Sequence, residues 1–219
     1  MNSTITSVQL LLLVCCCFGF VGSPLSWHHQ PGSDERGSSG QYVYEIEPES
    51  RLFLEGSSNV VDFTCDCTSR LGSGQFSIQA QQGTYRFSNG ELRLPVAVLD
   101  CGNRAMNRDM YEALKANQHP TISVKLVQVD APSPNTFNQC NEWKTFHANL
   151  LLTIAGIART VKMEVHGAHL GYQLYHFRAK QAIYLTDYGI DPPRALLGTV
   201  RVDNCITINM DLQIRVTAE

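Results

Sequence analysis

Alternation of apolar and polar side chains dominates the chain from about residue 41 onward. In the clearest run, apolar residues occupy every second position from Ile206 to Val216, and polar residues lie between them. Similar alternation covers residues 61–65, 76–80, 92–98, 122–126 and 175–185. A side-chain period of two is typical of a β-strand with one apolar face. Short, regularly spaced strands with almost no helix predict an all-β fold, an antiparallel sandwich or barrel.

The segment 148–165 predicts a β-hairpin. Apolar residues alternate from Ala148 to Ile154 before Gly156, and again from Val161 to Val165 after it. Two runs of period two around a glycine-containing turn indicate paired strands with one apolar and one polar face.

One short helix is expected near residues 107–117. Asn107 can act as its N-cap, and Met110 and Leu114 are spaced to lie one above the other on the same face. Pro120 prevents the helix from continuing.

The first 40 residues are expected to lie outside the folded domain. Residues 1–22 predict a signal peptide, because the apolar run 10–21 is too short to span a membrane comfortably. A membrane anchor is the alternative, and a lipoprotein site at Cys15–Cys17 is less favoured because Val14 stands where a small residue is needed. Residues 23–40 are rich in Gly, Ser, His and Pro and predict a flexible linker. The expectation is an exported protein, periplasmic or secreted, with one domain over residues 41–219.

Charge and local motifs exclude several function classes. The net charge of −3 and the lack of a basic run give no electrostatic footprint for nucleic acid. Gly56-Ser57-Ser58 lacks the glycine after the serine that a nucleophile elbow requires. We therefore expect no enzyme activity and no cofactor.

Five cysteines lie in the expected domain, at positions 65, 67, 101, 140 and 205. In an exported protein they indicate disulfides, and five cysteines permit about 15 ways to form two bridges. Cys65 and Cys67 share one strand face, so each is expected to bond elsewhere, with Cys101 the favoured partner. A Cys65/Cys67 metal site, or one at His166 and His169 in a turn around Gly167, lacks further ligands. We expect no bound metal.

Four motifs together resemble the YceI-like family. They are the hairpin segment Leu152–Arg159, the turn Glu55–Val60, the segment from Met106 to Ile122 and the late motif Thr186–Ile190. Ala158 departs from the pattern, because a threonine is usual there. The resemblance implies a lipocalin-like antiparallel β-barrel of about eight strands, whose helix covers one end. It also implies binding of polyisoprenoid or other long-chain lipids.

The apolar strand faces would then hold the ligand. The residues expected in the barrel interior are Phe63, Phe76, Ile78, Leu94, Val96, Val124, Leu126, Leu150, Leu152, Met163, Phe177, Ile183, Ile208, Met210 and Leu212. If the small inward side chains at Ala80, Ala148 and Ala179 leave a channel, an unbranched or isoprenoid chain would fit it. The expected partner is a hydrophobic small molecule, an isoprenoid lipid or a quinone. The hypothesis also admits peripheral contact with a membrane and a homodimer.

Two other functions fit the same sequence. One is a disulfide-stabilised structural or interaction module with a filled core and no ligand. The other is a thiol redox protein that uses Cys65 and Cys67.

Overall fold

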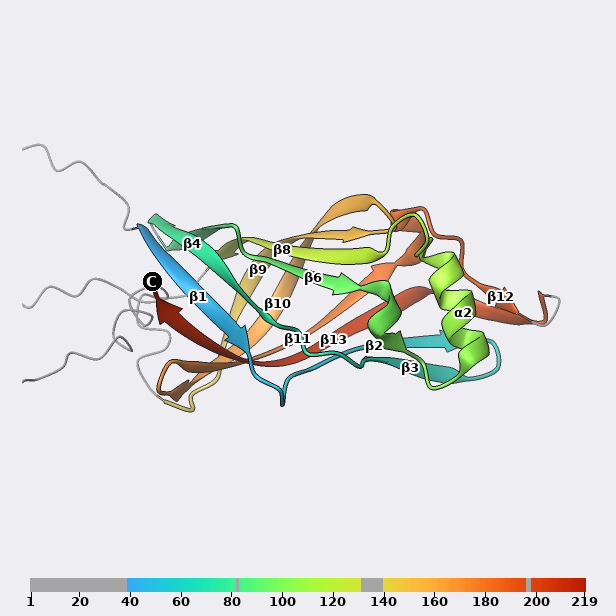
Figure 1. Cartoon of the computed structure of the whole chain (residues 1–219), viewed down its shortest axis with the longest axis horizontal. Helices are drawn as coiled ribbons and strands as arrows, with labels where there is room; N and C mark the ends of the chain where they lie inside the picture. Colours follow the sequence, from blue (N-terminus) through green and yellow to red (C-terminus); the bar gives the residue numbers. More distant parts are fainter. Residues whose placement is uncertain (1–38, 82, 131–139, 196–197) are drawn as a thin grey trace, which may run out of the picture.

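A computed structural model describes residues 39–81, 83–130, 140–195 and 198–219 (Figure 1). The expected signal peptide and nearly all of the expected linker lie outside these residues. The principal strands are β1 (Ser39–Ile46), β2 (Arg51–Ser58), β3 (Asp62–Cys67), β4 (Ser73–Gln81), β5 (Thr84–Ser88), β6 (Glu91–Pro95), β8 (Thr121–Asp130), β9 (Lys144–Ile154), β10 (Ile157–Gly171), β11 (Leu174–Tyr184) and β13 (Val200–Ala218). Shorter elements are β7 (Leu99–Asp100), β12 (Arg194–Ala195), α2 (Arg104–Ala113) and the 3-10 turns η1 (Val96–Val98) and η2 (Leu185–Tyr188).

Eight strands close into an antiparallel barrel. Their order is β1-β4-β5-β8-β9-β10-β11-β13, and β13 returns to pair with β1. The prediction of a lipocalin-like barrel of about eight strands is therefore confirmed. β1 begins at Ser39, two residues before the expected start of the domain.

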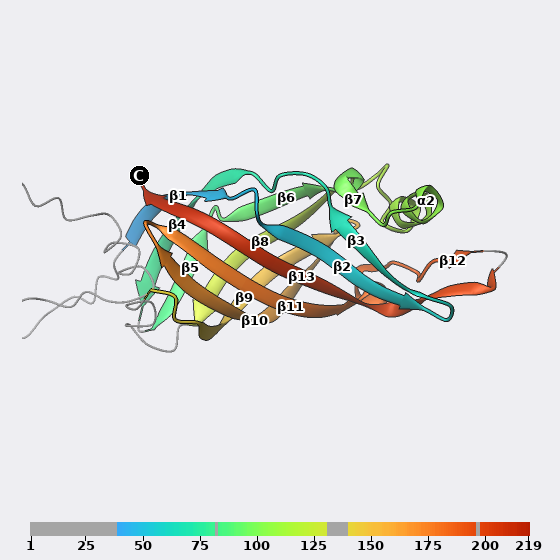
Figure 2. The same cartoon turned by 90° about the horizontal axis from the view of Figure 1, so that it is seen from below.

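The two ends of the barrel have different walls, because β8 and β13 each change partner along their length. β13 pairs with β2 over Val202–Asp211 and with β1 over Ile214–Ala218. β8 pairs with β6 at Thr121–Lys125 and with β5 at Gln128–Asp130. We call the end walled by β1, β4 and β5 the filled half, and the end walled by β2, β3 and β6 the hollow half. Helix α2 lies at the end of the hollow half (Figures 1 and 2).

Aromatic rings pack the interior of the filled half. Tyr42 stacks on Phe76 with ring centroids 5.5 Å apart, and Phe177 contacts both Tyr175 and Phe146 at 6.2 Å. Such pairs add to the stabilisation that burial of the rings provides. The small residues Ala80, Ala148 and Ala179 belong to this same cluster. These three alanines thus lie among bulky rings and not along the wall of the cavity described below.

The helix begins earlier than expected. Asn103, not Asn107, is its N-cap: the Asn103 side chain accepts hydrogen bonds from the backbone N–H groups of Ala105 and Met106. The Asn107 side chain instead accepts a bond from the Cys101 N–H at 2.7 Å. It also donates to a carboxylate oxygen of Asp100 at 2.8 Å. Asn107 thus fastens the first turn of α2 to the loop that precedes it.

The hairpin of β9 and β10 forms as predicted. Its two-residue turn is Ala155-Gly156, and both residues have positive φ, at 48° and 80°. That combination is typical of the type I′ turn, whose twist matches the flanking strands. A Cβ atom placed on Gly156 would lie 2.5 Å from a ring carbon of His119, so the turn also packs tightly against the segment before β8.

Gly156→Ala should therefore destabilise the barrel more than Gly72→Ala. Both glycines have φ of about 80°, but nothing lies within 4 Å of a Cβ on Gly72. Both variants incur the left-handed backbone cost of about 1–2 kcal/mol. Gly156→Ala must in addition displace the His119 ring, which adds about 1 kcal/mol or more. Urea unfolding of the two variants measures the difference, and equal losses would contradict the close packing of this turn.

Candidate ligand-binding cavity

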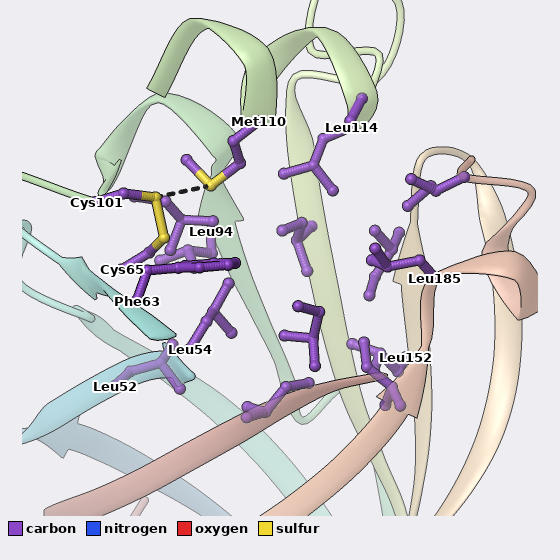
Figure 3. A pocket seen from close by; sticks show the side chains of 18 of the residues that line it. Leu52, Leu54, Phe63, Cys65, Leu94, Cys101, Met110, Leu114, Leu152 and Leu185 are labelled. Atoms are coloured by element: carbon purple, nitrogen blue, oxygen red, sulfur yellow. Dashed lines mark hydrogen bonds between the residues drawn. A yellow bond between two sulfur atoms is a disulfide. The ribbon is translucent and has the colours of Figure 1, made fainter. Parts of the chain in front are cut away.

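The hollow half contains a cavity of about 270 Å³ (Figure 3). Its wall is formed by 33 residues, nearly all of them Leu, Ile, Val, Met, Ala and Phe. Among these described lining residues, only Ser58 and Asp109 carry a side-chain oxygen or nitrogen. The site can therefore exclude water from an apolar molecule but offers almost no polar contact along its length.

The cavity runs from the middle of the barrel to the covered end. Its inner limit is formed by Leu150, Met163 and Leu212; the first two also belong to the aromatic cluster of the filled half. Its outer rim is formed by α2, by the hairpin of β2 and β3, and by β13 beside β12. Val61 on that hairpin is 58% exposed although it also lines the cavity, which places the opening at this rim.

The structure brings ten of the fifteen expected interior residues to the cavity wall. They are Phe63, Leu94, Val124, Leu150, Leu152, Met163, Ile183, Ile208, Met210 and Leu212. Their contact with a ligand stays a prediction.

The other five expected residues do not line the cavity. Phe76, Ile78, Leu126 and Phe177 belong to the aromatic cluster of the filled half. Val96 is only 1% exposed and packs in the core of the hollow half, within η1. All five lie on apolar faces or in the core, but away from the open space.

Sequence reasoning did not assign several lining residues to the site. Leu52 and Leu54 of β2 alternate with polar neighbours, so the period-two signal that selected the other strands could have found them. Met106 and Met110 reach the cavity from α2, and Leu114 follows directly after that helix. Their role depends on where α2 is placed over the barrel, which no local pattern reveals.

A disulfide between Cys65 and Cys101 forms part of the cavity wall (Figure 3). This confirms the prediction of a bridge from Cys65 or Cys67 to Cys101. The bond links β3 to the loop that leads into α2, and the Cys101 sulfur lies 3.6 Å from the Met110 sulfur. The remaining described cysteines, Cys67, Cys140 and Cys205, form no disulfide. The bridge ties the helix to the wall beside the cavity.

The other candidate ligands do not assemble into a metal site within the described part of the chain. His166 and His169 lie in β10 rather than in a turn. His166 contacts Thr145 at 2.9 Å and is exposed, whereas His169 is 2% exposed and stacks on Tyr175. Burial lowers the pKa of the His169 imidazole. The Cys140 sulfur lies 3.8 Å from Nδ1 of His169.

No helix in the described residues is long and apolar enough to cross a membrane. Together, the fold and the cavity define an antiparallel β-barrel with an apolar interior site under a terminal helix. The chain belongs to the YceI-like domain family, whose profile matches residues 44–214. No curated protein matches it in sequence.

Two solved structures share the fold. A polyisoprenoid-binding domain from Saccharophagus degradans, implicated in plant cell wall breakdown, aligns with a TM-score of 0.58 at 13% identity. The alignment covers 80% of this chain and 98% of that one. BcnA of Burkholderia cenocepacia aligns with a TM-score of 0.55 at 19% identity, over 77% of this chain and 99% of its own. At these identities the likeness shows the fold alone.

Removal of the disulfide should destabilise the protein strongly. For the 36-residue separation between Cys65 and Cys101, chain entropy predicts a loss of about 4 kcal/mol in the free energy of unfolding. We expect this loss in the double variant Cys65→Ala/Cys101→Ala, measured by urea unfolding without reductant. Cys205→Ala is the control, because Cys205 is exposed and unbonded. A double variant as stable as the control would contradict the bridge.

Proposed function

We propose that the protein binds a long apolar molecule, such as an isoprenoid or another lipid chain, in the cavity of the hollow half. The observation that best supports this proposal is an apolar cavity of about 270 Å³ inside the barrel. Protein cores pack at crystal-like density and contain few voids larger than a water molecule. A void of this size with a dry lining supports a ligand site rather than a filled structural core.

The size of the cavity indicates how much of a ligand it takes up. A 150 Å³ apolar cavity in another protein holds benzene, so 270 Å³ scales to about ten carbon atoms. Burial of ten methylene groups would contribute roughly 8 kcal/mol before the costs of association. The cavity as it stands would therefore enclose a ten-carbon segment, and a longer isoprenoid would need either a wider barrel or a tail that emerges at the rim.

The binding would involve no chemical step. Among the described lining residues, the Ser58 hydroxyl bonds only to backbone groups of its own turn, and no base is paired with it. The two lining cysteines are bonded to each other and offer no free thiol. The same bridge argues against a redox role for the Cys65/Cys67 pair. Membership of the YceI-like family and the likeness to a polyisoprenoid-binding domain support a binding role.

The proposed setting is outside the cytoplasm, because disulfides persist in oxidising compartments. Val60 and Val61 at the tip of the β2–β3 hairpin are 66% and 58% exposed beside the opening. These two side chains support peripheral contact with a membrane from which the ligand would be taken. A homodimer stays a prediction.

Leu152→Trp and Ile78→Trp form a matched test of the proposed function. Leu152 lines the cavity, and Ile78 packs in the aromatic cluster; both are buried. An indole at 152 should occupy ligand space, so the delipidated protein keeps most of its stability while co-purifying lipid falls. An indole at 78 should overpack the core and cost about 1–3 kcal/mol, with lipid retained by the folded fraction.

The measurements are mass spectrometry of solvent extracts and the melting temperature of delipidated protein. Loss of stability without loss of lipid in Leu152→Trp would favour a filled structural module over a carrier.

A further inference from the structure

We propose that the polar end of the ligand is a hydrogen-bond donor, a hydroxyl or an amine, which is held at the rim by Asp109. The cavity would then select long-chain alcohols or amines and reject chains that end in a carboxylate or phosphate. This inference rests on the proposed function and specifies the ligand class of the same cavity.

The first of the two polar lining residues is already engaged. The Ser58 hydroxyl donates to the carbonyl of Val61 at 2.9 Å. The same oxygen accepts from the N–H groups of Val60 at 3.2 Å and Val61 at 3.0 Å. These bonds hold the turn between β2 and β3, so the lining offers no free hydroxyl donor at this point.

Asp109 is the second polar lining residue, and it retains capacity to accept. It lies on α2 beside Met106 and Met110, which also line the cavity, and its side chain is 32% exposed. Arg108 donates to the Asp109 carboxylate from Nε at 3.1 Å and from Nη2 at 3.0 Å. Both bonds go to Oδ1, so Oδ2 makes no hydrogen bond with the described residues.

The charges around Asp109 leave the lining without a cationic partner for an anion. The Arg108 side chain is 75% exposed and does not line the cavity. An ionised carboxylate or phosphate at the rim would lose water and find no donor among the lining side chains, and Arg108, which does not line the cavity, is already paired with Asp109. The affinity of such an anion should therefore be lower than that of a neutral chain of equal length.

A head group that donates hydrogen bonds finds an acceptor at the rim, the Asp109 carboxylate. A carboxylate only accepts hydrogen bonds, and bonds to an ionised acceptor are about twice as strong as neutral ones. A hydroxyl or an ammonium group can therefore pair with Asp109 while its tail fills the cavity. An oxidised quinone carries only acceptor oxygens, so Asp109 gives it no bond.

Three ligands with one ten-carbon isoprenoid tail test the inference: geraniol, geranylamine and geranic acid. Binding to the delipidated protein is measured by titration calorimetry at neutral pH. We expect the alcohol and the amine to bind at least about tenfold more tightly than the acid, which corresponds to about 1.4 kcal/mol. Below the pKa of the acid itself, the acid becomes neutral and should approach the alcohol in affinity.

Asp109→Asn keeps the size of the side chain and removes its charge. In this variant we expect geranylamine to lose its higher affinity relative to geranic acid. We also expect the affinity of geranic acid to move closer to that of geraniol. Glu112→Gln is the matched control: it removes one negative charge from the same helix, at an exposed position outside the cavity lining. It should leave the order of affinities unchanged.

Each result bears on one of the two claims. Equal affinity of geraniol and geranic acid in the wild-type protein would overturn the inference and leave the proposed function standing. Selectivity that persists unchanged in Asp109→Asn would overturn the role of Asp109. If none of the three ligands binds the folded wild-type protein, the proposed function falls as well.

Discussion

The hollow half depends on how the barrel is closed between β3 and β6. In the filled half the ladder is continuous, because β1 pairs with both β4 and β13. In the hollow half, the described pairings join β6 only to β8, and β3 only to β2 and β7. The gap is spanned by the chain from β6 through η1 into β7, which pairs with β3, and the Cys65–Cys101 bridge fastens that pairing beside Asp66 and Asp100. Among the described pairings no ladder joins β3 to β6, so this part of the wall is not held at the spacing of a continuous sheet.

The filled and hollow halves of the barrel also differ in the side chains that point into them. Tyr42, Phe76, Phe146, Tyr175 and Phe177 fill one end with rings. At the other end, Phe63 is the only aromatic residue among the described residues that line the cavity, and aliphatic side chains cover most of the wall. One barrel thus combines a rigid packed base with an open apolar chamber, and α2 covers the chamber without filling it.

The sequence predicted the strands and their inward faces well, because alternation identifies a face directly. It could not predict the level of a residue along the barrel axis. Ile78 and Leu152 have the same alternating signal, yet one lies among aromatic rings and the other at the cavity. That distinction depends on the pairing of β13 with β2 at one end and β1 at the other. The helix start was also missed, because Asn103 and Asn107 are both suitable caps and only the path of the loop after Cys101 selects between them. The role proposed for Asp109 depends on the placement of α2 over the opening, which is likewise a tertiary property.

The central claim is that the hollow half encloses an apolar chain while the filled half does not. Crystals of the protein with 10-bromodecan-1-ol test it directly, because the anomalous signal of bromine marks the end of the chain. We expect a single strong bromine peak at the inner limit of the cavity, near Leu150, Met163 and Leu212. A peak on the outer surface of the barrel or among the rings around Phe177, with none inside the cavity, would contradict it.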